Sequence, residues 1–236
     1  FPTRRSSDLD AIWIGIAHAS VPSAQSVENK RDYMAVSLGQ IENLNYDYFA
    51  LGHIHIRQMC SNKVAYSGNI QGLNVKETGN KGGYLVSVEK QQTFVEPVDF
   101  NDILWEQETL LITPETETIN ELEHQIREQI SMVLTRCNCA ANNLILRMHV
   151  KGYSSVKKKI QDVQYLQDKL KDQTGVLDLE LKMANLKVPR DILALTSEKT
   201  VLAEILQRIQ NNEFEDELLE KILSLKIFDF DKTQLK

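Results

Sequence analysis

Cysteine, positive charge and long apolar runs are all scarce in this sequence, and each scarcity excludes a class of protein. The 236 residues include three cysteines, at positions 60, 137 and 139. An odd cysteine count, with no apolar segment typical of a signal peptide, favours a reducing compartment over the secreted disulfide-rich class. No apolar run approaches the roughly 18 residues of a membrane helix. We therefore expect a cytoplasmic protein that makes no membrane contact.

Positive charge is in deficit, because 27 Lys and Arg face 33 Asp and Glu for a formal net charge of −6. A basic surface over the whole chain is therefore excluded, and tight DNA binding without metal ions is not expected. The chain is nevertheless long enough, and at 42% hydrophobic residues apolar enough, for one or two globular domains with a core.

Two histidines follow the apolar run from Tyr48 to Leu51. The run predicts a buried strand that stops at Gly52, where glycine permits a tight backbone turn. His53 and His55 come next, and in extended chain residues i and i+2 face the same way. The spacing therefore predicts that both imidazoles serve one metal centre.

A second apolar run, from Ile12 to Ala17, ends at His18. Apolar residues at helical spacing between positions 29 and 43 predict a helix that joins the two strands. Such a unit is most simply a parallel pair with a right-handed crossover, whose carboxyl ends meet at one sheet edge. We therefore expect His18 to converge with His53 and His55. The alternative for His18 taken alone is an ordinary surface or hydrogen-bonded histidine.

These segments resemble the last two metal motifs of the calcineurin-like metallophosphoesterases. The stretches Gly52 to Gln58, Tyr66 to Gly72 and Glu77 to Tyr84 are similar, more narrowly, to SbcD-type DNA repair exonuclease subunits of the YhaO-like branch. The resemblance is strong over residues 11 to 100 and weak beyond. It implies two divalent ions, usually manganese, and cleavage of phosphodiester bonds in DNA.

The resemblance also implies a ligand set in which His18 and His53 hold one ion and His55 holds the other. The family has three further motifs, Asp-x-His, Gly-Asp and Gly-Asn-His followed by an acid, and none occurs in this sequence. In the family they supply the bridging carboxylate, most ligands of the first ion and the histidine that assists the leaving group. Neutral imidazoles offer no anionic bridge between two dications about 3.5–4 Å apart. We therefore expect no catalytic residue in this chain, and no dinuclear site or DNA cleavage from it alone.

The first nine residues have no apolar period and resemble a translated adaptor remnant. We expect residues 1–9 to be a non-native leader, and the rest to be the C-terminal part of a longer nuclease. The competing interpretation is a natural, unstructured start of a degenerate paralogue that binds no metal.

Beyond residue 103 the pattern changes. Strand-like segments at 104–112, 144–150 and 177–183 alternate with helical stripes at 119–133 and 156–170, which predicts a β-α-β-α-β module. We expect an α/β fold class: the C-terminal part of a metallophosphoesterase β-sandwich flanked by helices at 10–103, a small α+β cap domain at 104–188 and a helical tail at 189–236.

The partners expected from the resemblance are DNA and a coiled-coil ATPase subunit, and a homodimer stays open. Arg57 and Lys76 flank the histidine loop and are the candidate DNA contacts, although a solvated surface charge is the ordinary alternative for each. We expect the helical tail to pack either on the cap domain or on the ATPase. Two other functions stay open: a metallophosphoesterase with another phosphoester substrate, and a catalytically dead docking module.

Overall fold

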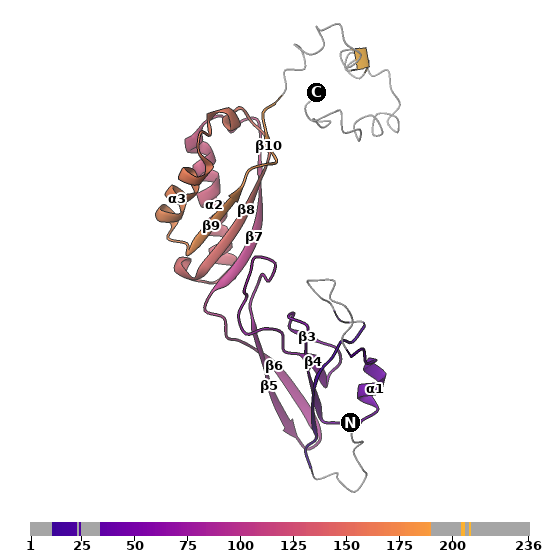
Figure 1. The fold of residues 1–236 in the computed structure, drawn as a ribbon. Coiled ribbons are helices and arrows are strands. Elements are labelled where there is room, and N and C mark those ends of the chain that lie inside the picture. The colour runs from indigo at the N-terminus through magenta and orange to yellow at the C-terminus, as the bar shows by residue number, and fades with distance from the viewer. Residues whose placement is uncertain (1–10, 23, 25–33, 190–203, 206–207, 209–236) are drawn as a thin grey trace. The chain divides into compact units, whose positions relative to one another are not determined.

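The computed structural model describes residues 11–22, 24, 34–189, 204–205 and 208 (Figure 1). The expected leader and nearly all of the expected helical tail lie outside these residues. The chain divides into two compact units: Phe1–Glu108 with Ile130–Met148 and Gln167–Glu180, and Thr109–Gln129 with His149–Leu166 and Leu181–Lys236. The boundaries expected at residues 103 and 188 stay predictions.

A four-stranded sheet carries the histidines at its strand ends. Its strands lie in the order β1 (Ile14–His18), β2 (Tyr48–Gly52), β4 (Val64–Tyr66) and β3 (Gln58–Met59). Strands β1 and β2 are parallel, with His18 opposite Gly52, and β4 is parallel to β2. Strand β3 returns antiparallel to β4. The predicted parallel pair is therefore confirmed.

The two histidine-bearing strands are buried to different extents. Phe49 and Leu51 of β2 are 1% and 2% exposed, because β2 has a strand on either side and a hydrophobic cluster around it. Ile14 and Ile16 of β1 are 57% and 77% exposed. Within the described residues β1 pairs only with β2, so it is an edge strand with one apolar face uncovered.

The helix expected over residues 29–43 is shorter than predicted. Residues 29–33 lie outside the described part of the chain, and Met34 has a φ of 43°, which a right-handed helix does not contain. Helix α1 spans only Leu38–Glu42. It begins at Ser37, whose side chain accepts a bond from the Gln40 backbone while the Gln40 side chain returns to the Ser37 backbone, a capping box.

A hairpin follows the four-stranded sheet: β5 (Gly82–Glu89) and β6 (Gln92–Asp99) form a two-stranded antiparallel sheet. Glu89 pairs with Gln92, so the connection has only two residues. Lys90 and Gln91 have φ values of 48° and 66°. Positive φ at both central positions matches the twist of a tight hairpin turn, here without glycine.

The remaining elements follow the predicted β-α-β-α-β order (Figure 1). They are β7 (Leu104–Ile112), α2 (Ile119–Cys137), η2 (Ala141–Asn143), β8 (Leu144–Tyr153), η3 (Ser155–Lys159), α3 (Val163–Thr174), β9 (Asp178–Lys182) and β10 (Leu186–Lys187). Their sheet has the order β10-β8-β7, and β9 also pairs with β8. The described part of the chain is thus mixed α/β with several sheets and few helices, as predicted.

Burial in this module follows the predicted periods. The α2 stripe and one face of β8 are at most 1% exposed: Leu122, Ile126, Ile130, Val133, Leu144, Leu146, Met148 and Val150. Figure 1 shows α2 and α3 alongside the strands. Among the described helices, none has both the length and the apolar character needed to cross a bilayer.

The second predicted helix of the module starts later than expected. Val156 is buried, but it lies in the short 3₁₀ turn η3, and Ile160 has extended backbone angles that end this turn. Asp162 then caps α3, because its Oδ1 atom accepts the backbone N–H groups of Gln164 and Tyr165 at 2.8 and 3.2 Å. The apolar spacing continues through the break, which is why the sequence pattern does not reveal it.

Candidate metal centre

The imidazoles of His18 and His53 lie against each other at the ends of two neighbouring strands. Their ring centroids are 5.2 Å apart, with the ring planes at 74°. Parallel pairing of β1 with β2 produces this proximity, because it places His18 beside Gly52, the residue before His53. The structure therefore brings together two of the three predicted ligands across 35 positions of sequence; their role as ligands stays a prediction.

The backbone turn predicted at Gly52 lies at His53 instead. A Cβ atom on Gly52 would lie 3.1 Å from His18 Nδ1, so glycine leaves space for that ring. His53 has a positive φ of 97°, which is strained in any residue that carries a Cβ atom. Strand β2 ends at Gly52, so the extended-chain argument for the shared facing of His53 and His55 does not apply at His53, and their service of one metal centre stays a prediction.

His55 is bound by an acidic residue from a distant loop. Its Nδ1 atom lies 2.8 Å from Oε1 of Glu77, and the two side chains are 46% and 9% exposed. The Glu77 carboxylate also accepts the Leu73 backbone N–H at 2.9 Å and Nδ2 of Asn69 at 3.0 Å. Burial raises the pKa of the Glu77 carboxyl, but the bonds from Leu73, His55 and Asn69 outweigh burial, so the net shift is downward.

The loop that carries Asn69 is held tightly against the histidine loop. Gly68 has a φ of 73°, and a Cβ there would lie 2.9 Å from the His55 carbonyl oxygen. The Asn69 backbone N–H donates to the same oxygen at 3.3 Å. Among the described residues, Asn69 Oδ1 is the one buried side-chain oxygen or nitrogen with no hydrogen-bond partner, an arrangement that costs about 1–3 kcal/mol.

Tyr66 holds the chain that follows His18. The Tyr66 hydroxyl donates to the Ala19 carbonyl at 2.7 Å and accepts the Val21 backbone N–H at 2.8 Å. The Tyr66 side chain is fully buried in β4. The exit of β1 is therefore attached to the sheet through one phenol, next to a predicted ligand.

The two candidate DNA contacts have different surroundings. Arg57 donates to the Val98 carbonyl at 2.9 Å and to Asp99 Oδ1 at 2.7 Å, which ties the histidine loop to β6. These bonds favour a structural role for Arg57, whose side chain is 19% exposed. Lys76 is exposed, and its backbone N–H donates to Asn74 Oδ1 at 2.9 Å. A DNA contact for either residue stays a prediction.

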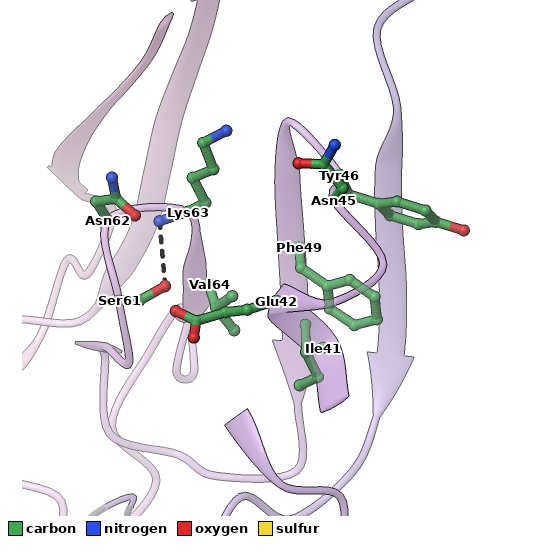
Figure 2. A pocket seen from close by; sticks show the side chains of 9 residues that line it. All are labelled: Ile41, Glu42, Asn45, Tyr46, Phe49, Ser61, Asn62, Lys63 and Val64. Atoms are coloured by element: carbon green, nitrogen blue, oxygen red, sulfur yellow. Dashed lines mark hydrogen bonds between the residues drawn. The ribbon is translucent and has the colours of Figure 1, made fainter. Parts of the chain in front are cut away.

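One cavity lies at the other ends of the same strands. It has a volume of about 190 Å³ and is lined by residues of α1, of the loops before β2 and β4, and by Phe49 and Val64 in these strands (Figure 2). Its polar groups include Glu42, Asn45 and Lys63, and it contains no histidine. Because β2 and β4 run parallel, the cavity lies at their amino ends, whereas His53 follows the carboxyl end of β2. It therefore belongs to no part of the candidate metal centre.

The donor chemistry suits a divalent metal only in part. Neutral imidazole is a good ligand for divalent transition metals, and its second nitrogen is commonly bound to a carboxylate, as in the pair His55–Glu77. Within the described ranges, however, no group of three or more His, Cys, Asp or Glu side chains is placed to hold a metal ion. The described residues provide one histidine pair and one histidine supported by an acid.

Sequence reasoning missed Glu77, Asn69 and Tyr66. Glu77 lies 22 positions after His55, and Tyr66 lies 45 positions after Val21, so no local spacing connects them. The available signal was an acidic residue between the glycines of a loop that follows the histidines.

No protein-family model matches the chain. Over 147 residues it is 31% identical to the uncharacterized metallophosphoesterase YhaO of Bacillus subtilis (strain 168), an alignment that covers 61% of this chain and 35% of YhaO. The chain thus spans about a third of the length of the curated relative that it matches. Over this part of its length the chain is therefore similar to a protein named as a metallophosphoesterase.

Proposed function

We propose that this chain is part of a divalent-metal-dependent phosphodiesterase that acts on DNA, with His18, His53 and His55 as part of the ligand set. The observation that carries the proposal is the 5.2 Å approach of the His18 and His53 rings at the exits of parallel strands. A surface histidine needs no such neighbour, and two imidazoles in contact are a natural half-site for a transition metal.

In this proposal the chain supplies orientation for the metal centre. Strand pairing places His18 and His53 together, and the Tyr66 hydroxyl fixes the backbone that follows His18. Bound divalent ions, in the family usually manganese, would activate a water and stabilise charge on the phosphate. The further ligands, including an anionic bridge, would come from outside the described residues.

The choice of DNA as substrate is supported by resemblance. The stretches Tyr66 to Gly72 and Glu77 to Tyr84 resemble the SbcD-type subunits, and they contribute Asn69 and Glu77, of which Glu77 binds His55 and Asn69 binds Glu77. A role in DNA repair and a coiled-coil ATPase partner follow from the same resemblance and belong to the proposal. The chemistry of the site does not by itself select DNA over another phosphoester.

A chimera tests the proposal. The part of YhaO that precedes its match to this chain is fused to residue 11, and degradation of linear duplex DNA is measured with and without Mn²⁺. We expect Mn²⁺-dependent cleavage by the chimera, none by the present chain, and near-complete loss in the chimeras with His18→Ala and His55→Ala. His124→Ala, which changes an exposed histidine on α2, is the matched control and should leave cleavage unchanged.

Two results would contradict the proposal. If the chimera cleaves nucleotides or small phosphodiesters but not DNA, the family is right and the substrate is wrong. If the folded chimera binds no Mn²⁺, or if cleavage survives His55→Ala, the histidines are not ligands and a non-catalytic docking role is favoured.

A further inference from the structure

We propose that Glu77 is a positioning residue: it holds the His55 imidazole in the tautomer with hydrogen on Nδ1 and so presents Nε2 to a divalent cation. This inference rests on the proposed function, because the orientation matters chemically only if His55 binds metal. Glu77 itself touches neither metal nor substrate in this account.

The donors around the carboxylate determine the tautomer. Glu77 is 8% exposed, and its two oxygens accept the Leu73 N–H at 2.9 Å and the Asn69 Nδ2 group at 3.0 Å in addition to His55 at 2.8 Å. An ionised carboxylate accepts hydrogen bonds and donates none. The nitrogen that faces it must therefore carry hydrogen, and in a neutral ring this places the lone pair on Nε2.

Asn69 is oriented toward the carboxylate at its own expense. A half-turn rotation of the amide would exchange Nδ2 and Oδ1. The Oδ1 atom would then face the Glu77 carboxylate, and two acceptor oxygens repel each other. The observed orientation keeps Nδ2 as the donor and leaves Oδ1 buried without a partner among the described residues. The Asn69 amide thus holds the Glu77 carboxylate although its own Oδ1 atom is left unpaired among these residues. Outer hydrogen bonds of this kind orient the side chains that bind metal ions.

The network is attached to the backbone of the histidine that it serves. The Asn69 N–H donates to the His55 carbonyl, and Gly68 packs too closely against that carbonyl for any side chain. His55 and its carboxylate therefore move together, so the ring direction is set by the fold and not by a mobile surface acid.

A second histidine–glutamate pair in the chain is exposed to solvent and serves as a comparison. His124 and Glu128 lie 3.5 Å apart on α2, with side chains 65% and 56% exposed. The Glu77 side chain, by contrast, is 9% exposed and is held by three donors. The contrast provides a matched control within one molecule.

The test is the tautomer of His55 in the present chain, measured at pH 8 by two-dimensional NMR that correlates ring protons with ring nitrogens. We expect hydrogen on Nδ1 in the wild type, and in Glu77→Ala a loss of that form in favour of hydrogen on Nε2. Glu128→Ala should leave both His55 and His124 unchanged. Hydrogen on Nε2 in the wild type, or an unchanged His55 in folded Glu77→Ala, would overturn the inference; if Glu77→Ala does not fold, the wild-type tautomer alone decides.

A titration with Zn²⁺, a diamagnetic probe, supplies the second readout. In the wild type Zn²⁺ should shift Nε2 of His55 while Nδ1 keeps its hydrogen, and Glu77→Ala should need about 10- to 100-fold more Zn²⁺ for the same shift. Binding through Nδ1, or equal affinity in the folded variant, contradicts the role of Glu77. The proposed function fails separately: a correct tautomer with no response of His55 to Zn²⁺ in the YhaO chimera, which supplies the further ligands, leaves Glu77 as a structural partner and removes His55 from the ligand set.

Discussion

The α+β module beyond residue 103 and the histidine-bearing sheet before it use their polar and apolar residues in different ways. In the module, burial repeats with the period of each element, and the α2 stripe and inner β8 face are almost fully covered. In the histidine-bearing region, β1 exposes Ile14 and Ile16, His53 has a φ of 97°, and Asn69 Oδ1 has no hydrogen-bond partner among the described residues. Exposed apolar residues, strained backbone and unpaired polar atoms are commonly found at functional sites, where side-chain positions serve function at the cost of stability.

Substitutions in the core of the α+β module should cause the largest loss in the free energy of unfolding. Ile126 on α2 is fully buried, so Ile126→Ala should lower the free energy of unfolding by about 2–5 kcal/mol through lost contacts and a cavity. Met132 on the same helix is 63% exposed, and Met132→Ala should change it by no more than about 0.5 kcal/mol. Urea unfolding followed by circular dichroism measures both. Similar losses in the two variants would refute the assignment of the buried stripe.

A smaller effect is expected at the exit of β1. Tyr66→Phe removes the hydroxyl that binds Ala19 and Val21 and leaves a buried N–H and carbonyl unpaired, which should cost about 1–3 kcal/mol of unfolding free energy. The same variant should alter the ring signals of His18 without changing those of His124. A variant as stable as the wild type would show that the phenol does not hold this segment.

The contribution of Tyr66 should also depend on pH with a definite sign. Burial raises the pKa of its phenol above the ordinary 10.0; the Val21 N–H bond opposes this shift and Cys60 adds to it. The unfolded chain therefore releases this proton first as pH rises, so the stability that Tyr66 supplies is complete below pH 10 and is lost above it. The difference between wild type and Tyr66→Phe should be constant up to about pH 10 and narrow beyond; a difference that grows there would contradict the burial of the phenol.

The smallest effect concerns the backbone of His53. Because φ is 97°, His53→Gly should be more stable than His53→Ala by about 1 kcal/mol, since glycine adopts this conformation without strain. At Glu128, in the middle of α2, the order should be reversed, with glycine less stable than alanine by about 1 kcal/mol. Thermal unfolding of the four variants compares the two positions. The same order at both positions would mean that His53 is not strained.

Much of the fold, and part of the candidate site, could be predicted from the sequence. The parallel pair β1–β2 and the order of the module follow from local periodicity, and the pairing brought His18 and His53 together. The start of α3 was misplaced because apolar spacing continued across the break before Asp162. Glu77 was missed because a loop brings it to His55, and residues in a loop follow no periodic pattern in the sequence.

The central claim is that parallel strands bring His18 and His53 to one metal half-site. The most direct measurement is a Zn²⁺ titration of the wild-type chain followed at the rings of all five histidines. The account predicts that His18 and His53 shift together at the same Zn²⁺ concentrations, while His124 and His149 keep their signals. A response of His18 without His53, or an equal response of all five rings, would contradict it.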